Sequence, residues 1–153
     1  MHQFPTYRRT LACSILLISL LGVSACNMSP MASDTSTTNV SLSGANEVPA
    51  TSSSGVGSMT ANLDKQTNLF TWTVTYSGLS GPVTGAHFHG PAKRGENAGV
   101  ALPLTGSLES PIRGTATLTG AQREAVVNGN WYINLHTAAN PNGEIRGQIA
   151  MYP

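Results

Sequence analysis

The sequence predicts an all-β domain, an antiparallel β-sandwich or barrel of about eight strands with at most one short helix. From residue 40 onward, apolar and polar residues alternate with the period of two that is typical of strands with one buried face. Turn-forming Gly, Pro, Asn and Asp residues interrupt this pattern at short intervals. Strands and helices do not alternate, and no glycine-rich phosphate loop precedes a helix, which excludes a parallel nucleotide-binding sheet.

The first three strands are expected at residues 40–43, 59–63 and 70–76. Residues 64–68 (DKQTN) separate the second strand from the third and have the composition of a hairpin loop. The third strand has the clearest pattern, because large side chains alternate with threonines and so occupy one face. These large residues, which we expect in the core, are Phe70, Trp72, Val74 and Tyr76.

Five further strands and one short helix are expected in the second half of the chain. The strands are expected at residues 83–90, 100–104, 114–119, 131–137 and 144–151. Thr119 and Gln122 have the spacing of a capping box, so a helix of at most two turns should begin at Gly120. Gly129 is placed to end it.

Residues 1–25 are predicted to be a signal peptide. Two arginines precede an apolar run over residues 11–23, which is too short to cross a bilayer as a helix. Residues 20–26 (LLGVSAC) resemble the lipobox of bacterial lipoproteins. That resemblance implies cleavage before Cys26 and attachment of lipid, including palmitate, to Cys26. An ordinary secretory signal cleaved near Ala25 is the alternative.

A lipoprotein of this kind would be exported and lipid-anchored to the bacterial cell envelope. Asn27, rather than Asp, follows Cys26, which resembles the sorting pattern for the outer membrane in Gram-negative bacteria. Residues 26–39 are rich in Ser and Thr and are expected to form a flexible tether, with the domain at 40–153. Cys13 would leave with the signal, so the mature domain would contain no free thiol and no disulfide.

The charge content excludes several classes of partner. Only 10% of the residues are charged, and loss of the two arginines in the signal reduces the eight basic residues to six, against seven acidic ones. A nearly neutral chain has no basic surface for a phosphate backbone, so no nucleic-acid partner is expected. The scattered acids and the absence of a Gly-x-Ser-x-Gly motif give a hydrolase little support, so no catalytic residue is assigned.

Three histidines provide the most concentrated chemistry of the domain. His87 and His89 share one face of their strand, and His136 lies opposite the apolar face of another strand, together with Tyr132 and Asn134. If the two strands are neighbours, three neutral imidazoles could bind Zn²⁺ or Cu²⁺ and leave a fourth position open. The alternative is that each histidine hydrogen-bonds a carbonyl, a carboxylate or Asn134 without any metal.

An ion pair is expected near the C-terminal end of the chain. Glu144 and Arg146 share one face of the last predicted strand, opposite Ile145 and Ile149. Arg146 could bind a carboxylate through two hydrogen bonds, and Glu47 is a further candidate partner. A structural ion pair among Glu47, Glu144 and Arg146 is favoured over a ligand-binding arginine.

Four motifs in order resemble the chordin-domain (CHRD) family over about residues 40–151. They are 42–49 (LSGANEVP), 86–92 (AHFHGPA), 132–137 (YINLHT) and 140–149 (NPNGEIRGQI). The resemblance implies an extracytoplasmic all-β domain, found singly in bacterial secreted proteins and repeated in the animal chordins, which are growth-factor antagonists. It implies no settled biochemical activity.

Residues 85–89 (GAHFH) are also similar to the copper strand of Cu/Zn superoxide dismutases. That family requires further histidines, an aspartate and a disulfide, whereas here only His136 remains, so superoxide dismutation is not expected. The leading hypothesis is therefore a non-enzymatic, surface-anchored module that binds an extracellular protein, a glycan or a metal. The alternatives are a purely structural envelope role and a copper- or zinc-binding protein or small metalloenzyme that uses His87, His89 and His136.

Overall fold

The computed structural model describes residues 1–2 and 34–151. The expected signal peptide, Cys26 and most of the expected tether therefore lie outside the described residues. Within the described part of the chain, no helix has the length and apolar character needed to cross a membrane.

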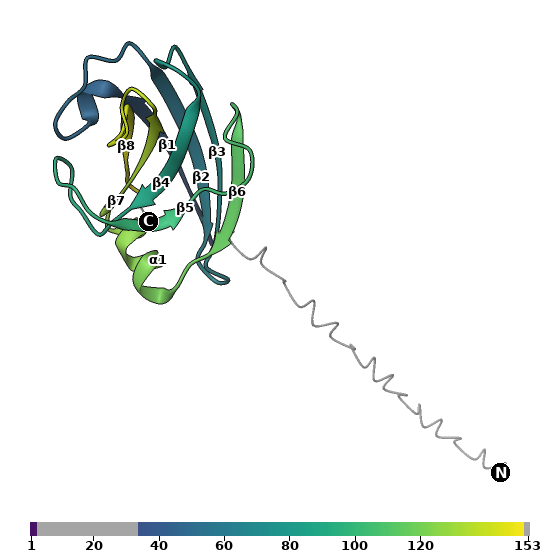
Figure 1. The fold of residues 1–153 in the computed structure, drawn as a ribbon. Helices are drawn as coiled ribbons and strands as arrows, with labels where there is room; N and C mark the ends of the chain where they lie inside the picture. The colour runs from purple at the N-terminus through teal and green to yellow at the C-terminus, as the bar shows by residue number, and fades with distance from the viewer. Residues whose placement is uncertain (3–33, 152–153) are drawn as a thin grey trace. The chain divides into compact units, whose positions relative to one another are not determined.

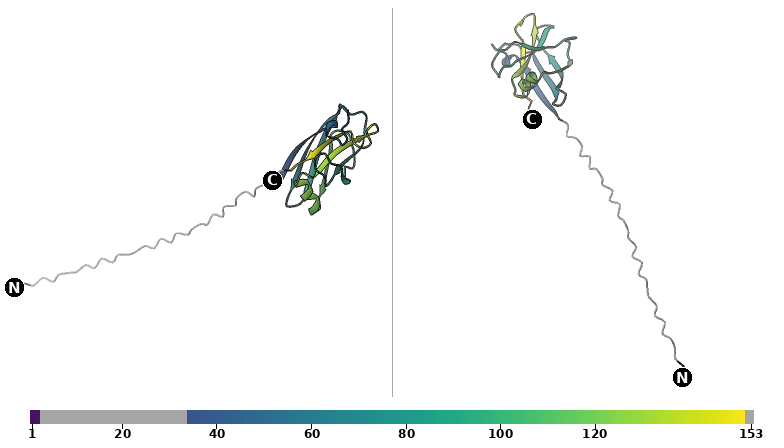
Figure 2. Two further views of the ribbon diagram at one scale, coloured as in Figure 1. Left: turned by 90° about the vertical axis from the view of Figure 1, so that its left-hand side faces the viewer. Right: turned by 90° about the horizontal axis from the view of Figure 1, so that it is seen from below.

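The domain is built on one antiparallel sheet of eight strands, in the order β5-β4-β7-β8-β1-β2-β3-β6 (Figure 1). The sheet curls like a half-barrel, as the two further views show (Figure 2). This confirms the predicted all-β class and strand number. The strands are β1 (Thr35–Ser43), β2 (Val56–Asp64), β3 (Leu69–Ser77), β4 (Val83–His89), β5 (Val100–Pro103), β6 (Ile112–Thr117), β7 (Trp131–Thr137) and β8 (Ile145–Ile149).

The first strand begins earlier than expected, which corrects the boundary of the predicted tether. β1 begins at Thr35 and pairs with β2 along its whole length, so residues 35–39 belong to the sheet. The inward positions at this end are occupied by Ser36, which is buried, and Thr38, which donates to the carbonyl oxygen of Ala150. Because these inward residues are polar, the alternation of apolar residues does not reveal this part of the strand.

The concave face of the sheet holds the apolar core. Phe70 and Trp72 of β3 contact Phe88 of β4, with ring centroids 5.3 and 5.1 Å apart, and Phe88 stacks on Trp131 of β7 at 5.9 Å. β3 and β4 are separated by four strands in the sheet order, so these contacts show how strongly the sheet curls. The expected placement of the aromatic residues of β3 in the core is confirmed for Phe70 and Trp72, whereas Tyr76 is only partly buried against the core.

Helix α1 (Gly120–Val127) covers one end of the core, where Val126 is fully buried. The predicted capping box is present: Thr119 Oγ1 accepts from the Gln122 N–H at 3.3 Å, and Gln122 Oε1 accepts from the Thr119 N–H at 2.9 Å. Gly129 follows the helix with a φ of 72°, a conformation that favours glycine. A single turn of 3₁₀ helix, η1 (Gly44–Asn46), follows β1.

Candidate metal centre

The outer face of β4, β7 and β8 carries a layer of polar side chains. In the β4–β7 pairing, Gly85 lies opposite His136, His87 opposite Asn134, and His89 opposite Tyr132. Alternate residues of a strand share a face, so these three rungs lie side by side on one surface. The sequence left open whether the two histidine strands are neighbours, and the structure places them next to each other.

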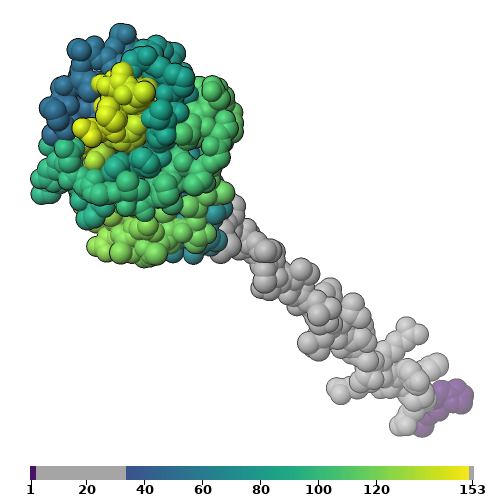
Figure 3. Space-filling model, viewed as in Figure 1, coloured from purple at the N-terminus to yellow at the C-terminus, as the bar shows by residue number. Residues whose placement is uncertain are grey.

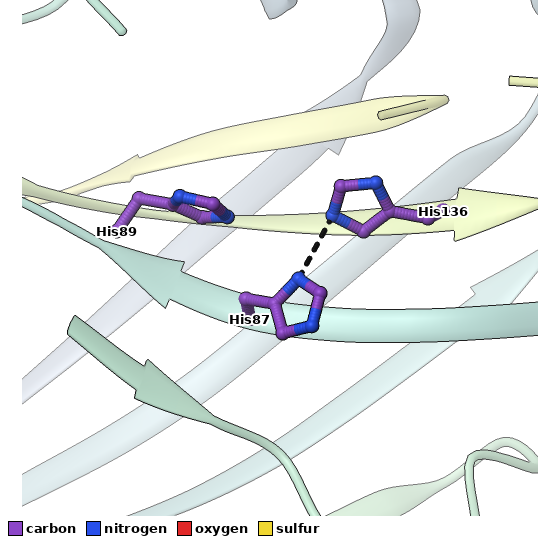
Figure 4. A group of neighbouring side chains, drawn as sticks. All are labelled: His87, His89 and His136. Carbon is purple, nitrogen blue, oxygen red and sulfur yellow. Dashed lines mark hydrogen bonds between the residues drawn. The ribbon is translucent and has the colours of Figure 1, made fainter. Parts of the chain in front are cut away.

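The three imidazole rings converge. One potential ligand atom from each of His87, His89 and His136 lies within 4.8 Å of the other two, and the side chains point toward one another (Figure 4). His87 Nδ1 and His136 Nε2 are 3.0 Å apart and share a hydrogen bond. The arrangement therefore brings together all three ligands that the sequence predicted.

Backbone carbonyl groups fix the protonation of two of the rings. His89 Nδ1 lies 3.0 Å from Ala98 O, and His136 Nδ1 lies 3.0 Å from Pro141 O. A carbonyl oxygen only accepts, so each Nδ1 carries the hydrogen and each Nε2 keeps its lone pair. Metal-binding histidines characteristically donate their second ring nitrogen in this way. Carbonyl partners were the alternative that the sequence analysis kept open, and the structure shows them for His89 and His136. The sequence could not identify which carbonyl groups accept, because a backbone acceptor has no side-chain signature.

His89 Nε2 is buried and has no hydrogen-bond partner. It belongs to a side chain that is only 9% exposed, which leaves little room for solvent to compensate. A lone pair that is buried without a partner is costly, by about 1–3 kcal/mol for a typical polar group. This nitrogen is the least satisfied atom of the three-histidine cluster.

Burial favours the neutral form of His87 and His136. Desolvation lowers the pKa of His87, and the neighbouring His136 and His89 lower it further. Desolvation also lowers the pKa of His136, although the hydrogen bond to Pro141 partly opposes this effect. Neutral imidazole is the form that binds metal, so these two rings are in a binding-competent state at pH 7.

Tyr132 and Arg146 support His89 from the side. The rings of His89 and Tyr132 are stacked, with centroids 4.8 Å apart and planes inclined by only 4°. The Arg146 guanidinium lies 3.4 Å from the centroid of Tyr132. The same guanidinium donates to Asn97 Oδ1 at 3.0 Å and to Glu96 O at 2.6 Å, and so holds the β4–β5 loop over this face.

The expected ionic trio is divided between two environments. The Glu144 carboxylate accepts hydrogen bonds from the hydroxyl groups of Ser53, Ser80 and Thr137, at 2.7, 2.5 and 2.5 Å. Desolvation acts against its ionised form, but these hydrogen bonds prevail and lower its pKa to about 2. Glu144 therefore connects two loops and the end of β7 through hydroxyl groups, and nothing in the sequence identified those partners.

Glu47 lies in a different part of the polar layer, beside Asn134 and within the electrostatic influence of Arg146. Burial raises the pKa of Glu47 to about 7, although the charge of Arg146 and the Asn134 amide both oppose this. The hydrogen bonds of Arg146 go to Asn97 and Glu96, as described above, so Glu47 and Arg146 interact through charge. Residues 47–51 and 139–143 line a surface hollow of about 250 Å³. The space-filling view shows the blue and yellow segments near each other on this surface (Figure 3).

Comparison with known proteins identifies the family of the chain. A search of curated proteins and a search of solved structures each find no match. The family model described as "CHRD domain" matches residues 38–149, which include all three histidines and most of the sheet. Because this match covers most of the chain, the protein belongs to the CHRD domain family.

Proposed function

We propose that the domain is a non-enzymatic metal-binding module in which His87, His89 and His136 hold one Zn²⁺ or Cu²⁺ ion. The observation that carries the proposal is the buried, unpartnered Nε2 of His89, whose lone pair lies close to the ligand atoms of two further histidines. A metal ion would supply the missing partner. Membership of the CHRD family favours binding over catalysis.

The donor set suits both metals. Zn²⁺ and Cu²⁺ accept neutral imidazole ligands, and three histidines with one further open position form a known type of zinc site. Zn–N bonds of about 2.0–2.1 Å require the ring nitrogens to move closer than their present spacing of up to 4.8 Å. His87 is the ring that can move, because its hydrogen bond goes to His136 rather than to the backbone. Cu²⁺ should bind more tightly than Zn²⁺ at the same ligands.

Metal analysis and thermal melts of the purified protein test this proposal. We expect one Zn²⁺ or Cu²⁺ per chain and a higher melting temperature in the presence of metal, because a ligand that binds only the folded state stabilises it. Both effects should be lost in His87→Gln and His136→Gln and retained in Gln66→Ala, which alters an exposed loop. A wild-type protein that stays metal-free, and whose melting is unchanged by excess Zn²⁺ and Cu²⁺, would rule out the site.

We further propose that the protein is anchored to the bacterial envelope by lipid on Cys26. The support is the lipobox-like stretch at residues 20–26. Cys26→Ser should release the protein from the membrane fraction, whereas Cys13→Ser, which alters the predicted signal, should leave it there. Unchanged membrane association of Cys26→Ser would contradict the anchor. In a Gram-negative host, density-gradient separation should place the wild-type protein in the outer membrane.

A further inference from the structure

We propose that Asn134 is the fourth residue of the metal centre and that its Oδ1 accepts a hydrogen bond from a water molecule bound to the metal. This inference rests on the proposed metal-binding function and concerns the position that the three histidines leave open. It assigns that position to a ligand that carries a hydrogen, namely water. Two independent features of the structure support it: the place of Asn134 among the histidines and an unpartnered atom in its side chain.

The strand register places Asn134 at the centre of the cluster. His87 and Asn134 form the middle of the three rungs, while His136 and His89 lie diagonally across it, on the rungs to either side. The point where the three rings converge is therefore above the middle rung. Side chains directly opposite each other in an antiparallel pair have Cβ atoms about 4.5–5.5 Å apart. Asn134 thus faces His87 across that point.

The other two residues of these rungs do not compete for the position. Gly85, opposite His136, has no side chain, and Tyr132 stacks against the ring of His89. A Cβ placed on Gly85 would lie only 3.2 Å from His87 Cε1, so the space above this glycine is already taken by the His87 ring. Asn134 is therefore the remaining polar side chain on the three rungs that can contact a ligand of the metal.

The amide oxygen of Asn134 is unpartnered. Asn134 is 2% exposed, and its Oδ1 is buried without a hydrogen-bond partner. The Nδ2 end lies near Gly143 and the carboxyl group of Glu47: a Cβ on Gly143 would be 2.6 Å from Nδ2 and 2.5 Å from Glu47 Oε1. In this orientation the Nδ2 hydrogens lie on the side of the Glu47 carboxyl group, and the Asn134 amide favours the ionised form of that group by lowering its pKa. Oδ1 therefore needs a donor from elsewhere.

A metal ion that carries one water molecule satisfies both unpartnered atoms of the centre. The metal would accept the lone pair of His89 Nε2, and the water would donate to Asn134 Oδ1. Because Oδ1 only accepts, it selects a fourth ligand that has a hydrogen to donate. Azide has no such hydrogen, so it must displace the water and give up this hydrogen bond.

Azide binding to the Cu²⁺-loaded protein tests the assignment through the charge-transfer band of the copper–azide complex. Asn134→Leu removes the acceptor at similar volume, so the water is held less well and azide should bind about three- to tenfold more tightly. Asn134→Asp keeps an acceptor and adds negative charge, so azide should bind several-fold more weakly. Asn62→Leu makes the same exchange on β2, away from the centre, and should leave azide affinity unchanged.

Each outcome bears on the proposal. Equal azide affinity in the wild type, Asn134→Leu and Asn134→Asp would overturn it. A hundredfold loss of Cu²⁺ affinity in Asn134→Leu, together with a wild type that binds no azide, would place Oδ1 on the metal itself and overturn the water assignment. If Asn134→Leu does not fold, Asn134→Ser supplies the same comparison with a side chain too short to reach the water. A wild type that takes up no metal is detected before azide is added and refutes the proposed function instead.

Discussion

Glu47 offers the most quantitative test of the polar layer, because its ionisation is coupled to folding. Its side chain is 7% exposed, and burial raises its pKa from 4.5 to about 7. The folded protein therefore holds a proton on Glu47 more tightly than the unfolded chain does. Replacing Glu47 with Gln keeps the shape of the neutral acid and removes the titration, so the variant isolates this contribution.

The sign and size of the effect follow from the pKa. The stabilising contribution of Glu47 is fully present below about pH 4.5, declines as the pH rises and is lost above about pH 7. A pKa difference of this size corresponds to roughly 3 kcal/mol. Solvent that reaches the group at the adjoining surface hollow should screen part of it, which leaves about 2 kcal/mol. Glu47→Gln should therefore gain about 2 kcal/mol relative to the wild type between pH 4.5 and pH 8.

Urea unfolding followed by tryptophan fluorescence measures this gain, because Trp72 and Trp131 are both buried in the core. The measurements are made with EDTA present so that metal binding does not contribute. Glu109→Gln, at an exposed position, is the matched control and should track the wild type at every pH. A difference between Glu47→Gln and the wild type that stays constant over this pH range, or that changes in the opposite direction, would refute the reasoning.

Three further substitutions test other parts of the structure. Glu144→Gln should lower the free energy of unfolding in urea by about 3 kcal/mol at pH 7. This cost should fade as the pH approaches 2, because the stability supplied by a lowered pKa is present above pH 4.5 and lost below it. A cost independent of pH would contradict this. Gly85→Ala should weaken Zn²⁺ binding about tenfold in chelator competition without lowering the melting temperature. The reason is that the added Cβ would lie 3.2 Å from His87 Cε1. Unchanged affinity would mean that the His87 ring adapts. Gly114→Ala should lower the free energy of unfolding in urea by about 2–3 kcal/mol, because its Cβ would lie 2.3 Å from Trp72 Cζ2. An unchanged free energy of unfolding would exclude tight packing at this position.

The local pattern of the chain was enough to predict which residues form strands, but only where apolar residues occupy the inward positions. β3 shows this best, since Phe70, Trp72 and Val74 all lie in the core. The start of β1 was missed because its inward residues are Ser36 and Thr38, which carry no hydrophobic signal. Periodicity thus reports the polarity of a face, and it does not report pairing to a neighbouring strand.

The order of the strands in the sheet could not be predicted from local pattern. β7 and β4 are neighbours although β5, β6 and α1 lie between them in the chain, and β1 is placed between β8 and β2. Period-two alternation correctly placed His87, His89 and His136 on polar faces. Their convergence depends on the β4–β7 pairing, which is a property of the whole fold.

The expected ion pair shows why charge alone does not identify partners. Glu144 and Arg146 have opposite charges and were expected on one face, but Glu144 accepts its hydrogen bonds from Ser53, Ser80 and Thr137. These hydroxyl groups come from three segments that are distant in sequence. A buried carboxylate is stabilised by whichever donors the fold brings to it, and neutral hydroxyl groups are far too common in this chain to be recognised in advance.

The outer face of β4, β7 and β8 combines features that have opposite effects on stability. The β4–β5 loop, which Arg146 holds through Glu96 and Asn97, lies over part of this face, and His89 and Asn134 are buried there. Buried polar atoms normally find partners, because each unsatisfied atom costs about 1–3 kcal/mol. His89 Nε2 and Asn134 Oδ1 have none, and both belong to side chains that border the same point. His89 Nε2 has an unpartnered lone pair beside two further imidazoles, and Asn134 on the adjacent rung has an unpartnered oxygen that can only accept. A metal ion with one bound water would complete both.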